Sequence, residues 1–372
     1  MKWALYNLTA TTTVGGMETS VWWLARALMN RGRQVTVYGG ESRRELPQAA
    51  QGVPKRVFPF KDRKDFINLG TRARKLLERL SFARAAMPAL VADQPDRLLI
   101  FKPYDIFPAL WARKRCGAPA GLYSGGVEPY PLAGRLAARL DYRAAFSQYN
   151  ANRMEEAMGV AVAVNYPGVD TSRFRPGPPD PDLAREYKIA PNDPVAVMAV
   201  RLVGWKGVQD AVAAVGLLSS KWPGLRLLVA GEGPFRTELE SQIKSLGLQS
   251  RVGLVGFLDP NRLAGFYALG RVALFPSRGE EALGLSIAEA MACGLATIGA
   301  DQGGIPEVIG EGGGILTPPG DAPALADNLD KLLSDDGLRA SLAAAGMARA
   351  RRVFNWDACA ARLEQGLADE GP

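Results

Sequence analysis

"VALFPSRGEEALGLSIAEAMACGLATIGA", residues 272–300, contains in order a short apolar strand, a loop, a helix and a second apolar strand. This order is the repeating unit of an open parallel sheet covered by helices. Two glutamates, Glu281 and Glu289, lie eight positions apart, the first before the predicted helix and the second within it. Ligands of such sheets bind beyond the carboxyl ends of the strands, so we expect the loop before the helix to carry function.

The same alternation of strand and helix extends over the rest of the chain. Apolar strands are predicted at 3–6, 34–40, 97–101, 195–200, 225–230 and 251–257, in addition to the two in the opening stretch. The Pro- and Gly-rich stretch at 164–182 interrupts the alternation and indicates a domain boundary. We therefore expect two doubly wound α/β domains, at 1–165 and 166–352, with a cleft between them. The helix at about 353–372 is expected to pack back on the first domain.

Composition narrows the class of protein. The 372 residues are 47% hydrophobic and 22% charged, which is typical of a globular protein of about two domains. The opening residues lack the apolar core of a signal peptide, and no apolar run is long enough to span a membrane. Three scattered cysteines do not make a disulfide framework, and a reducing cytoplasm is the expected compartment. The chain contains no histidine, which excludes Ser-His-Asp catalysis and histidine-bound zinc.

Charge is distributed unevenly along the chain. Residues 1–168 contain 25 Lys and Arg against 13 Asp and Glu, whereas residues 169–372 contain 20 against 25. The basic half is expected to meet an anionic partner, and a membrane surface and nucleic acid are both candidates. Of these two candidates we do not expect nucleic acid, because the basic segment at 55–84 lacks an aromatic-interleaved motif.

Two loops after predicted strands suit a phosphate group. Arg201 and Lys206 follow the strand at 195–200 and combine a planar guanidinium with a mobile ammonium, although a solvated loop has the same composition. Gly15 and Gly16 open the first long helix, where backbone amides approach anions, although an ordinary turn is the alternative. Neither matches the G-x-G-x-x-G or P-loop pattern.

The loop and helix of the opening stretch suit a phosphate flanked by hydroxyl groups. Gly284 is expected in the first turn of the helix, and amides from Leu283 to Leu285 would face the ligand. Glu281 suits sugar hydroxyls, and Glu289 suits a vicinal diol such as a ribose. A favourable charge at a helix start explains Glu281 equally simply, and a solvated helix face explains Glu289. The apolar neighbours of Glu289 favour a bound or paired carboxylate.

Four segments together resemble family 4 of the retaining glycosyltransferases, which have the GT-B fold. The stretch at 276–309, "PSRGEEALGLSIAEAMACGLATIGADQGGIPEVI", is similar to the E-x7-E segment and following Gly-Gly loop of that family. "VRLVGWKGVQDAV" is similar to its Arg…Lys-Gly element, and "VGGMETSVWWLARALMNRGRQVTVY" to its N-terminal glycine loop and helix. "PGVDTSRFRP" is similar to the segment that enters the second domain. The resemblance covers nearly the whole chain.

The resemblance implies a nucleotide-sugar donor held by the second domain, with UDP-sugars favoured over GDP-sugars, and neither cofactor nor metal. Arg201 and Lys206 would bind the diphosphate, and Glu281 the sugar. The implied donor-binding residues are Gly15, Gly16, Gly231, Phe257, Leu283, Gly284, Leu285 and Glu289. One D-x-D sequence, at 180–182, is expected to cap a helix rather than bind a metal.

One departure from the family pattern concerns the first domain. Many members have a histidine near the sugar, after the strand that here is part of "APAGLYSGG", and Ser124 or Gly125 occupies about that place. Four other residues are candidates for its role, and the sequence does not choose among Lys102, Tyr104, Asp105 and Glu128.

A strongly basic segment at 55–84 contains ten basic and three acidic residues. Its apolar positions recur at helical spacing: Phe66, Leu69, Ala73, Leu76, Leu77 and Leu80. Arg72, Lys75 and Arg79 lie on other faces of this helix. One interpretation is a helix that contacts an anionic bilayer and brings the active site to a lipid-linked acceptor. The other is a surface helix that packs its apolar stripe on its own sheet.

The resulting expectation is a retaining, metal-independent glycosyltransferase that acts on a glycolipid or polysaccharide precursor of the cell envelope, peripherally at the inner membrane surface. Two alternatives share the site. A nucleotide-sugar 2-epimerase would form product without an acceptor, and a binding protein would retain the nucleotide site without turnover.

Overall fold

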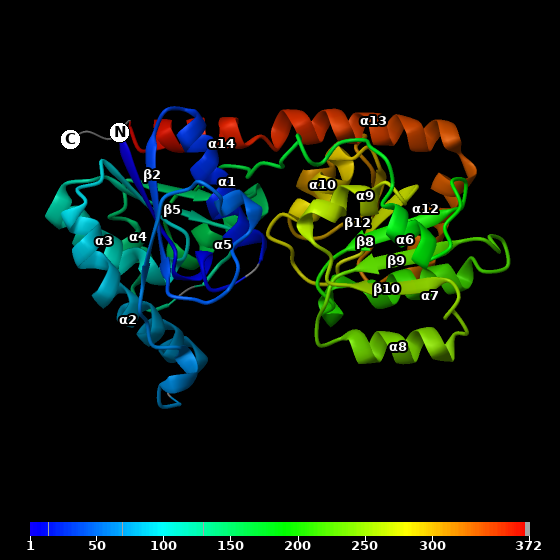
Figure 1. The fold of residues 1–372 in the computed structure, drawn as a ribbon, viewed down its shortest axis with the longest axis horizontal. Helices are drawn as coiled ribbons and strands as arrows, with labels where there is room; N and C mark the ends of the chain where they lie inside the picture. Colours follow the sequence, from blue (N-terminus) through cyan, green and yellow to red (C-terminus); the bar gives the residue numbers. More distant parts are fainter. Residues whose placement is uncertain (14, 69, 129, 369–372) are drawn as a thin grey trace. The chain divides into compact units, whose positions relative to one another are not determined.

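Alternating strands and helices build two structural units in the computed structural model, which describes residues 1–13, 15–68, 70–128 and 130–368 (Figure 1). Unit 1 consists of Met1–Gly168 and Asn355–Pro372, and unit 2 of Val169–Phe354. Each unit is an open sheet with helices on both faces, so the predicted α/β class is confirmed. The predicted boundaries after 165 and 352 lie a few residues before those of the structure.

The sheet of unit 1 is parallel throughout, and its chain order places a topological switch point between β1 and β4. The chain runs outward from β1 to β3 and then returns to β4 on the other side of β1. The strands in spatial order are β3 (Lys55–Phe58), β2 (Gln34–Gly40), β1 (Lys2–Tyr6), β4 (Arg97–Ile100), β5 (Ala120–Ser124), β6 (Tyr142–Ala145) and β7 (Ala163–Val164). A ligand of this unit is expected beyond the ends of β1 and β4.

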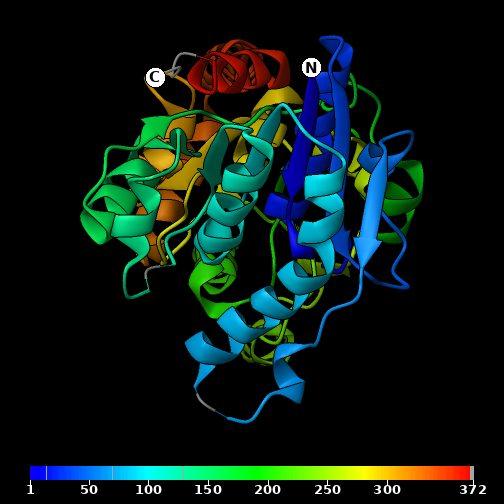
Figure 2. The same cartoon turned by 90° about the vertical axis from the view of Figure 1, so that its left-hand side faces the viewer.

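Helices cover both faces of this sheet. One core contains Tyr6 of β1, Phe82 of α2 and Ala109 of α3, all without exposed surface. Figure 2 shows α2 and α3 side by side on the outside of this face. The helices of unit 1 are α1 (Gly16–Asn30), α2 (Thr71–Ala92), α3 (Ile106–Cys116), α4 (Ala133–Ala137), α5 (Gln148–Met158) and α14 (Trp356–Gly366).

Unit 2 repeats the arrangement with a second parallel sheet, whose switch point lies between β8 and β11. The strands in spatial order are β10 (Val252–Gly256), β9 (Arg226–Ala230), β8 (Val195–Ala199), β11 (Val272–Phe275), β12 (Ala296–Ala300) and β13 (Ile315–Thr317). The helices are α6 (Pro181–Glu186), α7 (Val208–Leu217), α8 (Arg236–Ser245), α9 (Leu263–Tyr267), α10 (Leu285–Ala292), α11 (Ile305–Ile309), α12 (Ala322–Ser334) and α13 (Asp336–Val353).

The last described helix, α14, belongs to unit 1 although it follows unit 2 in the sequence. It contacts α1, and Glu364 on it pairs with Arg31 and Arg33. Two hydrogen bonds join its buried side to Asn165 of unit 1. The Asn165 Nδ2 donates to the Cys359 carbonyl at 3.1 Å, and the Arg362 Nε donates to the Asn165 Oδ1 at 2.9 Å. Unit 1 is therefore closed by a helix that is distant in sequence.

Four strands of the structure were not among those expected from the sequence: β3, β6, β7 and β13. β3 is largely exposed at the sheet edge, and β7 and β13 are only two and three residues long. Such strands lack the apolar run on which the prediction depended. None of the described helices is both long and apolar enough to cross a bilayer.

Candidate functional site

Lys206 and Glu281 meet at the switch point of unit 2. Lys206 ends a short 3-10 turn, Gly204–Lys206, after β8, and its ammonium pairs with the Glu281 carboxylate in the loop after β11. Both side chains are mostly buried, at 13% and 14% exposed. The ammonium also lies 4.5 Å from the centroid of the Trp205 ring. Within the described residues the guanidinium of Arg201, which is exposed just beyond β8, makes no ion pair.

The start of α10 supplies free backbone amides beside this pair. Its N-cap is Gly284, and no side chain caps the helix. Gly284 has a φ of 93°, a left-handed conformation that strains any residue with a Cβ. A Cβ there would also meet the Ile287 Cδ1 at 2.9 Å. The amides between Leu283 and Leu285 thus begin the helix without a side-chain acceptor, which suits an anionic ligand.

Three loops pack directly on one another around these groups. The Gly304 amide donates to the Glu281 carbonyl at 2.8 Å, and a Cβ on Gly303 would lie 2.6 Å from the same oxygen. The Arg278 amide donates to the Trp205 carbonyl at 2.7 Å, which joins the Glu281 loop to the Lys206 loop. The glycine pair is therefore required by close backbone packing, and its effect on the site is to hold Glu281 in place.

Glu289 lies one helical turn into α10 and has different neighbours. Burial raises the pKa of its carboxyl to about 7; the charge of Arg173 opposes this shift, and that of Asp170 adds to it. Both residues come from the segment that enters unit 2. The carboxylate thus has a cationic neighbour, as its apolar surroundings in the sequence suggested, but no signal in the sequence pointed to Arg173 or Asp170.

Gly231 and Phe257 lie after neighbouring strands of unit 2. A Cβ on Gly231 would lie 1.9 Å from the Val200 carbonyl oxygen, so this glycine allows the Arg201 loop to approach β9. Phe257 follows β10 and is 69% exposed. In unit 1, Gly15 is the N-cap of α1, and a Cβ on Gly16 would meet nothing within 4 Å. The backbone at Gly16 is consequently open to a ligand.

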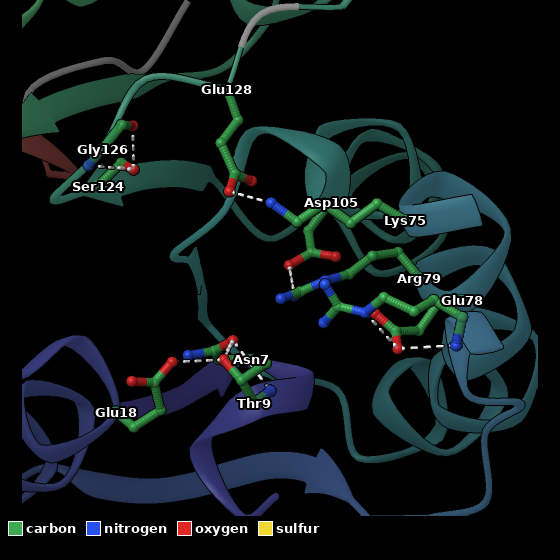
Figure 3. Close-up of polar contacts among 11 residues, drawn as sticks. Asn7, Thr9, Glu18, Lys75, Glu78, Arg79, Asp105, Ser124, Gly126 and Glu128 are labelled. Carbon is green, nitrogen blue, oxygen red and sulfur yellow. Dashed lines mark hydrogen bonds and ion pairs between the residues drawn. The ribbon is translucent and has the colours of Figure 1, made fainter. Parts of the chain in front are cut away.

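A polar cluster lies beyond the ends of β1 and β4 in unit 1, at its switch point (Figure 3). Asp105 has no exposed surface, and its Oδ2 accepts from the Arg79 Nη1 at 2.7 Å. Burial raises the pKa of Asp105 to about 6, against the opposing charge of Arg79. Lys75, one turn before Arg79 on α2, pairs with Glu128. Figure 3 shows these side chains and Asn7 directed toward the same region from different elements.

Three buried polar atoms of this neighbourhood have no hydrogen-bond partner among the described residues: the Tyr6 hydroxyl, the Asn7 Nδ2 and the Asp105 Oδ1. A buried polar atom without a partner is costly, so a ligand or water that completes these bonds is favoured. Burial alone would raise the pKa of Glu128, but the hydrogen bond from Lys75 and the charges of Lys102 and Arg79 lower it below its ordinary value.

Two of the four candidates for the missing histidine's role, Asp105 and Glu128, belong to this cluster. Lys102 acts on both through its charge. Tyr104 stacks on Tyr130, with ring centroids 5.2 Å apart, and the Lys75 ammonium lies 5.8 Å from the centroid of the Tyr104 ring.

The D-x-D sequence at 180–182 has the predicted capping role. The Asp180 Oδ1 accepts from the amides of Asp182 and Leu183 at 3.1 Å, and its carboxylate also receives two hydrogen bonds from Arg262. Across the described ranges no group of three or more His, Cys, Asp or Glu side chains is arranged to hold a metal ion.

Comparison with known proteins defines the class to which this architecture belongs. The profile "Glycosyltransferase Family 4" matches residues 14–173, and "Glycosyl transferases group 1" matches residues 180–349. The D-inositol 3-phosphate glycosyltransferase of Acidothermus cellulolyticus is 30% identical over 92% of this chain and 83% of its own length. The chain belongs to glycosyltransferase family 4 and has the GT-B fold.

Other similar proteins match a smaller part of the chain or have a lower sequence identity to it. The GDP-mannose-dependent alpha-(1-6)-phosphatidylinositol monomannoside mannosyltransferase of Mycobacterium tuberculosis is 30% identical, and the match spans 59% of this chain and 60% of that protein. The sucrose-phosphate synthase of Thermosynechococcus elongatus has a TM-score of 0.80 at 21% identity, over 98% and 97% of the chains. Anabaena HepE in complex with UDP and glucose has a TM-score of 0.78 at 22% identity, over the full length of both. These two structures share the fold.

Proposed function

We propose that this chain is a retaining, metal-independent glycosyltransferase that moves a sugar from a nucleotide-diphosphate sugar to a hydroxyl group of an acceptor. The observation that carries the proposal is the Lys206–Glu281 pair at the unit 2 switch point, directly before the uncapped start of α10. A cation and free amides suit a diphosphate, and a carboxylate suits the hydroxyls of a sugar. Membership of family 4 and the activities named for its relatives support the same reaction.

The proposed chemistry follows from where charge develops. When the bond between the anomeric carbon and the diphosphate oxygen breaks, its electron pair stays on the diphosphate and positive charge develops on the sugar ring. Arg201, Lys206 and the α10 amides stabilise the departing diphosphate. The acceptor oxygen bonds to the anomeric carbon on the same face, and its proton passes to the departing phosphate oxygen. In this proposal protein groups alone compensate the charge, without a metal.

The remaining donor contacts are assigned by residue. Glu289 binds the ribose hydroxyls, and Phe257 and Gly231 lie near the nucleotide. Gly15 and Gly16, at the start of α1 in unit 1, suit a phosphate group. We propose a UDP-sugar in preference to a GDP-sugar, while the named mycobacterial relative uses GDP-mannose.

The polar cluster of unit 1 is the proposed site for a saccharide acceptor. Its pairs, Lys75 with Glu128 and Arg79 with Asp105, balance their charges, and its unpartnered atoms include both donors and acceptors. Hydroxyl groups satisfy both kinds. Asp105 and Glu128 are the residues that we assign to the role of the absent histidine. The acceptor class that we propose is a glycolipid or polysaccharide precursor of the cell envelope, at the cytoplasmic membrane surface.

The first test is a thermal-shift screen with UDP-, GDP- and ADP-sugars at millimolar concentration. A donor present at about 100 times its dissociation constant stabilises the folded protein by about 2.7 kcal/mol, which raises the melting temperature by several degrees. We expect one nucleotide class to do so and the others to have little effect. No shift with any of them would overturn the proposed donor site, and turnover of the donor without an acceptor would favour an epimerase.

The raised pKa of Glu289 predicts a pH dependence of nucleotide binding. Below pH 7 the carboxyl is protonated, and above it the carboxylate accepts hydrogen bonds from both ribose hydroxyls. The dissociation constant of the nucleoside diphosphate, measured by calorimetry, should therefore fall between pH 6 and 8 by about tenfold relative to Glu289→Gln. Comparing the two proteins removes the titration of the diphosphate itself. Parallel pH profiles would show that Glu289 does not contact the ligand.

The raised pKa of Glu289 also makes the stability of the fold depend on pH. Because the folded pKa of about 7 lies above the ordinary value of 4.5, the carboxyl stabilises the fold only while it is protonated. The free energy of unfolding of the unliganded protein should fall relative to Glu289→Gln as the pH rises from about 4.5 to about 7. Chemical denaturation at several pH values measures the difference.

A further inference from the structure

An apolar groove lies between α2 and α3. Figure 2 shows these two helices on the outside of unit 1. Its volume is about 270 Å³, and its walls include Leu80, Met87 and Pro88 of α2 with Phe107 and Trp111 of α3. Phe107 is 57% exposed and Trp111 is 36% exposed. These two aromatic rings lie at one open surface with the exposed Pro88, whereas Met87 is only 4% exposed. Adjoining exposed apolar groups of this kind mark an interaction site, which isolated ones do not.

The surface around this groove is basic. The helices α2 and α3, together with residues 132–140 around the adjoining α4, expose these basic side chains: Arg72, Arg84, Lys114, Arg115, Arg135 and Arg139. The only carboxylate in those three segments is Glu78, which is 3% exposed and accepts a hydrogen bond from Arg63. The Arg115 guanidinium lies 4.8 Å from the centroid of the Trp111 ring. These three segments therefore combine apolar and cationic groups with no exposed carboxylate of their own.

We propose that the α2–α3 groove and its basic border bind the surface of an anionic phospholipid bilayer. Phe107 and Trp111 insert at the level where acyl chains meet headgroups, and Arg84, Lys114 and Arg115 contact the lipid phosphates. Aromatic rings favour this interface, and clustered basic side chains are attracted to its negative potential. The complementary charge is the reason for choosing a bilayer over an apolar protein partner.

This surface differs from the one that the sequence indicated. Only one of the two interpretations of the basic segment put α2 against a membrane, and two of its basic residues, Lys75 and Arg79, turn into the polar cluster and pair with Glu128 and Asp105. Membrane contact therefore falls to Arg84 and to α3. Leu69, which the sequence placed on the apolar stripe, lies outside the described residues. The inference rests on the proposed function only in that the acceptor is taken to be lipid-linked.

The first experiment measures cosedimentation of the full chain with phosphatidylglycerol–phosphatidylcholine vesicles and with phosphatidylcholine vesicles. We expect partition to the anionic vesicles only. The double variant Phe107→Ser/Trp111→Ser and the triple variant Arg84→Gln/Lys114→Gln/Arg115→Gln should each weaken it about tenfold or more. Control variants in unit 2, Leu217→Ser/Leu246→Ser and Arg351→Gln/Arg352→Gln, remove exposed groups of the same kinds and should not change it.

A second measurement tests insertion rather than attraction. Lipids brominated on the acyl chain should quench part of the tryptophan fluorescence of the wild type, and Trp111→Phe should lose that quenched part while still binding. Absence of binding to anionic vesicles would overturn the proposal, as would equal binding of the groove variants or unchanged quenching in Trp111→Phe. The thermal shift with nucleotide-sugars is independent of all these outcomes, so failure of the membrane surface is distinguishable from failure of the donor site.

Discussion

Lys206→Ala is expected to lower kcat/KM for donor turnover by about 10²–10³-fold. The ammonium is mostly buried beside the uncapped start of α10, where the diphosphate is proposed to gain charge as the sugar leaves. Interactions with developing charge in a site of low dielectric constant have the largest effects on rate. The measurement is release of nucleoside diphosphate from whichever donor the thermal-shift screen identifies. Lys221→Ala is the matched control, because that lysine is 61% exposed and pairs with Asp330 elsewhere in unit 2.

Substitution of Glu281, the partner of Lys206, distinguishes two roles of the ion pair. In the unliganded protein Glu281 neutralises the ammonium, so Glu281→Gln should free Lys206 for phosphate. We expect this variant to bind the nucleoside diphosphate at least as tightly as the wild type does. Its turnover should still fall at least tenfold, because the sugar loses the negative charge and one of the two acceptor oxygens of the carboxylate. Lys206→Ala should weaken both. If Glu281→Gln weakened diphosphate binding as much as Lys206→Ala does, Glu281 would serve only to position the lysine.

Asp105→Ala is expected to destabilise unit 1 by about 3–5 kcal/mol. The substitution leaves the guanidinium of Arg79, which is 4% exposed, without its carboxylate partner in the interior. Removing both charges in Arg79→Met/Asp105→Leu should recover most of the stability, because no uncompensated charge then remains. Amide hydrogen exchange in β1 and β4 measures the change within unit 1, since a chain of two units need not unfold in one step.

The control for these substitutions is an ion pair whose carboxylate is exposed. Arg339 and Asp336 lie three residues apart on α13, and the Asp336 side chain is 79% exposed. Asp336→Ala should change stability by no more than about 1 kcal/mol. If the recovered double variant also retained full transfer activity, the cluster would be a structural pair and the proposed acceptor site would be wrong.

Much of the fold was predictable because the central strands are continuous apolar runs. β1, β8, β11 and β12 are almost fully buried, and each precedes a loop with a recognisable composition. The edge strand β3, in contrast, exposes Lys55 and Arg56, and no apolar periodicity identifies such a strand. The order of the strands in each sheet cannot be predicted from the local sequence pattern either, because it depends on which strands pair.

The same distinction applies to the site. Lys206 and Glu281 are close in space because both loops end at one switch point, which the strand–helix alternation made predictable. Arg79 and Asp105 are 26 residues apart, and the basic face of α2 looked like a solvent or membrane surface. The contact between Arg79 and Asp105 can be predicted only when the packing of α2 on the sheet is known. One available signal was Asp105 itself, a lone carboxylate just after the strand predicted at 97–101.

The discontinuous course of unit 1 has a consequence for biosynthesis. The ribosome completes all of unit 2 before it reaches α14, whose residues close the network around Asn165 and Cys359. During that interval the sheet face beneath α14 lacks its cover, and Tyr123 and Asn165 lack partners that they have in the finished protein. The hydrogen-bonded interior of unit 1 around Asn165 is therefore completed only after the whole of unit 2 has been synthesised.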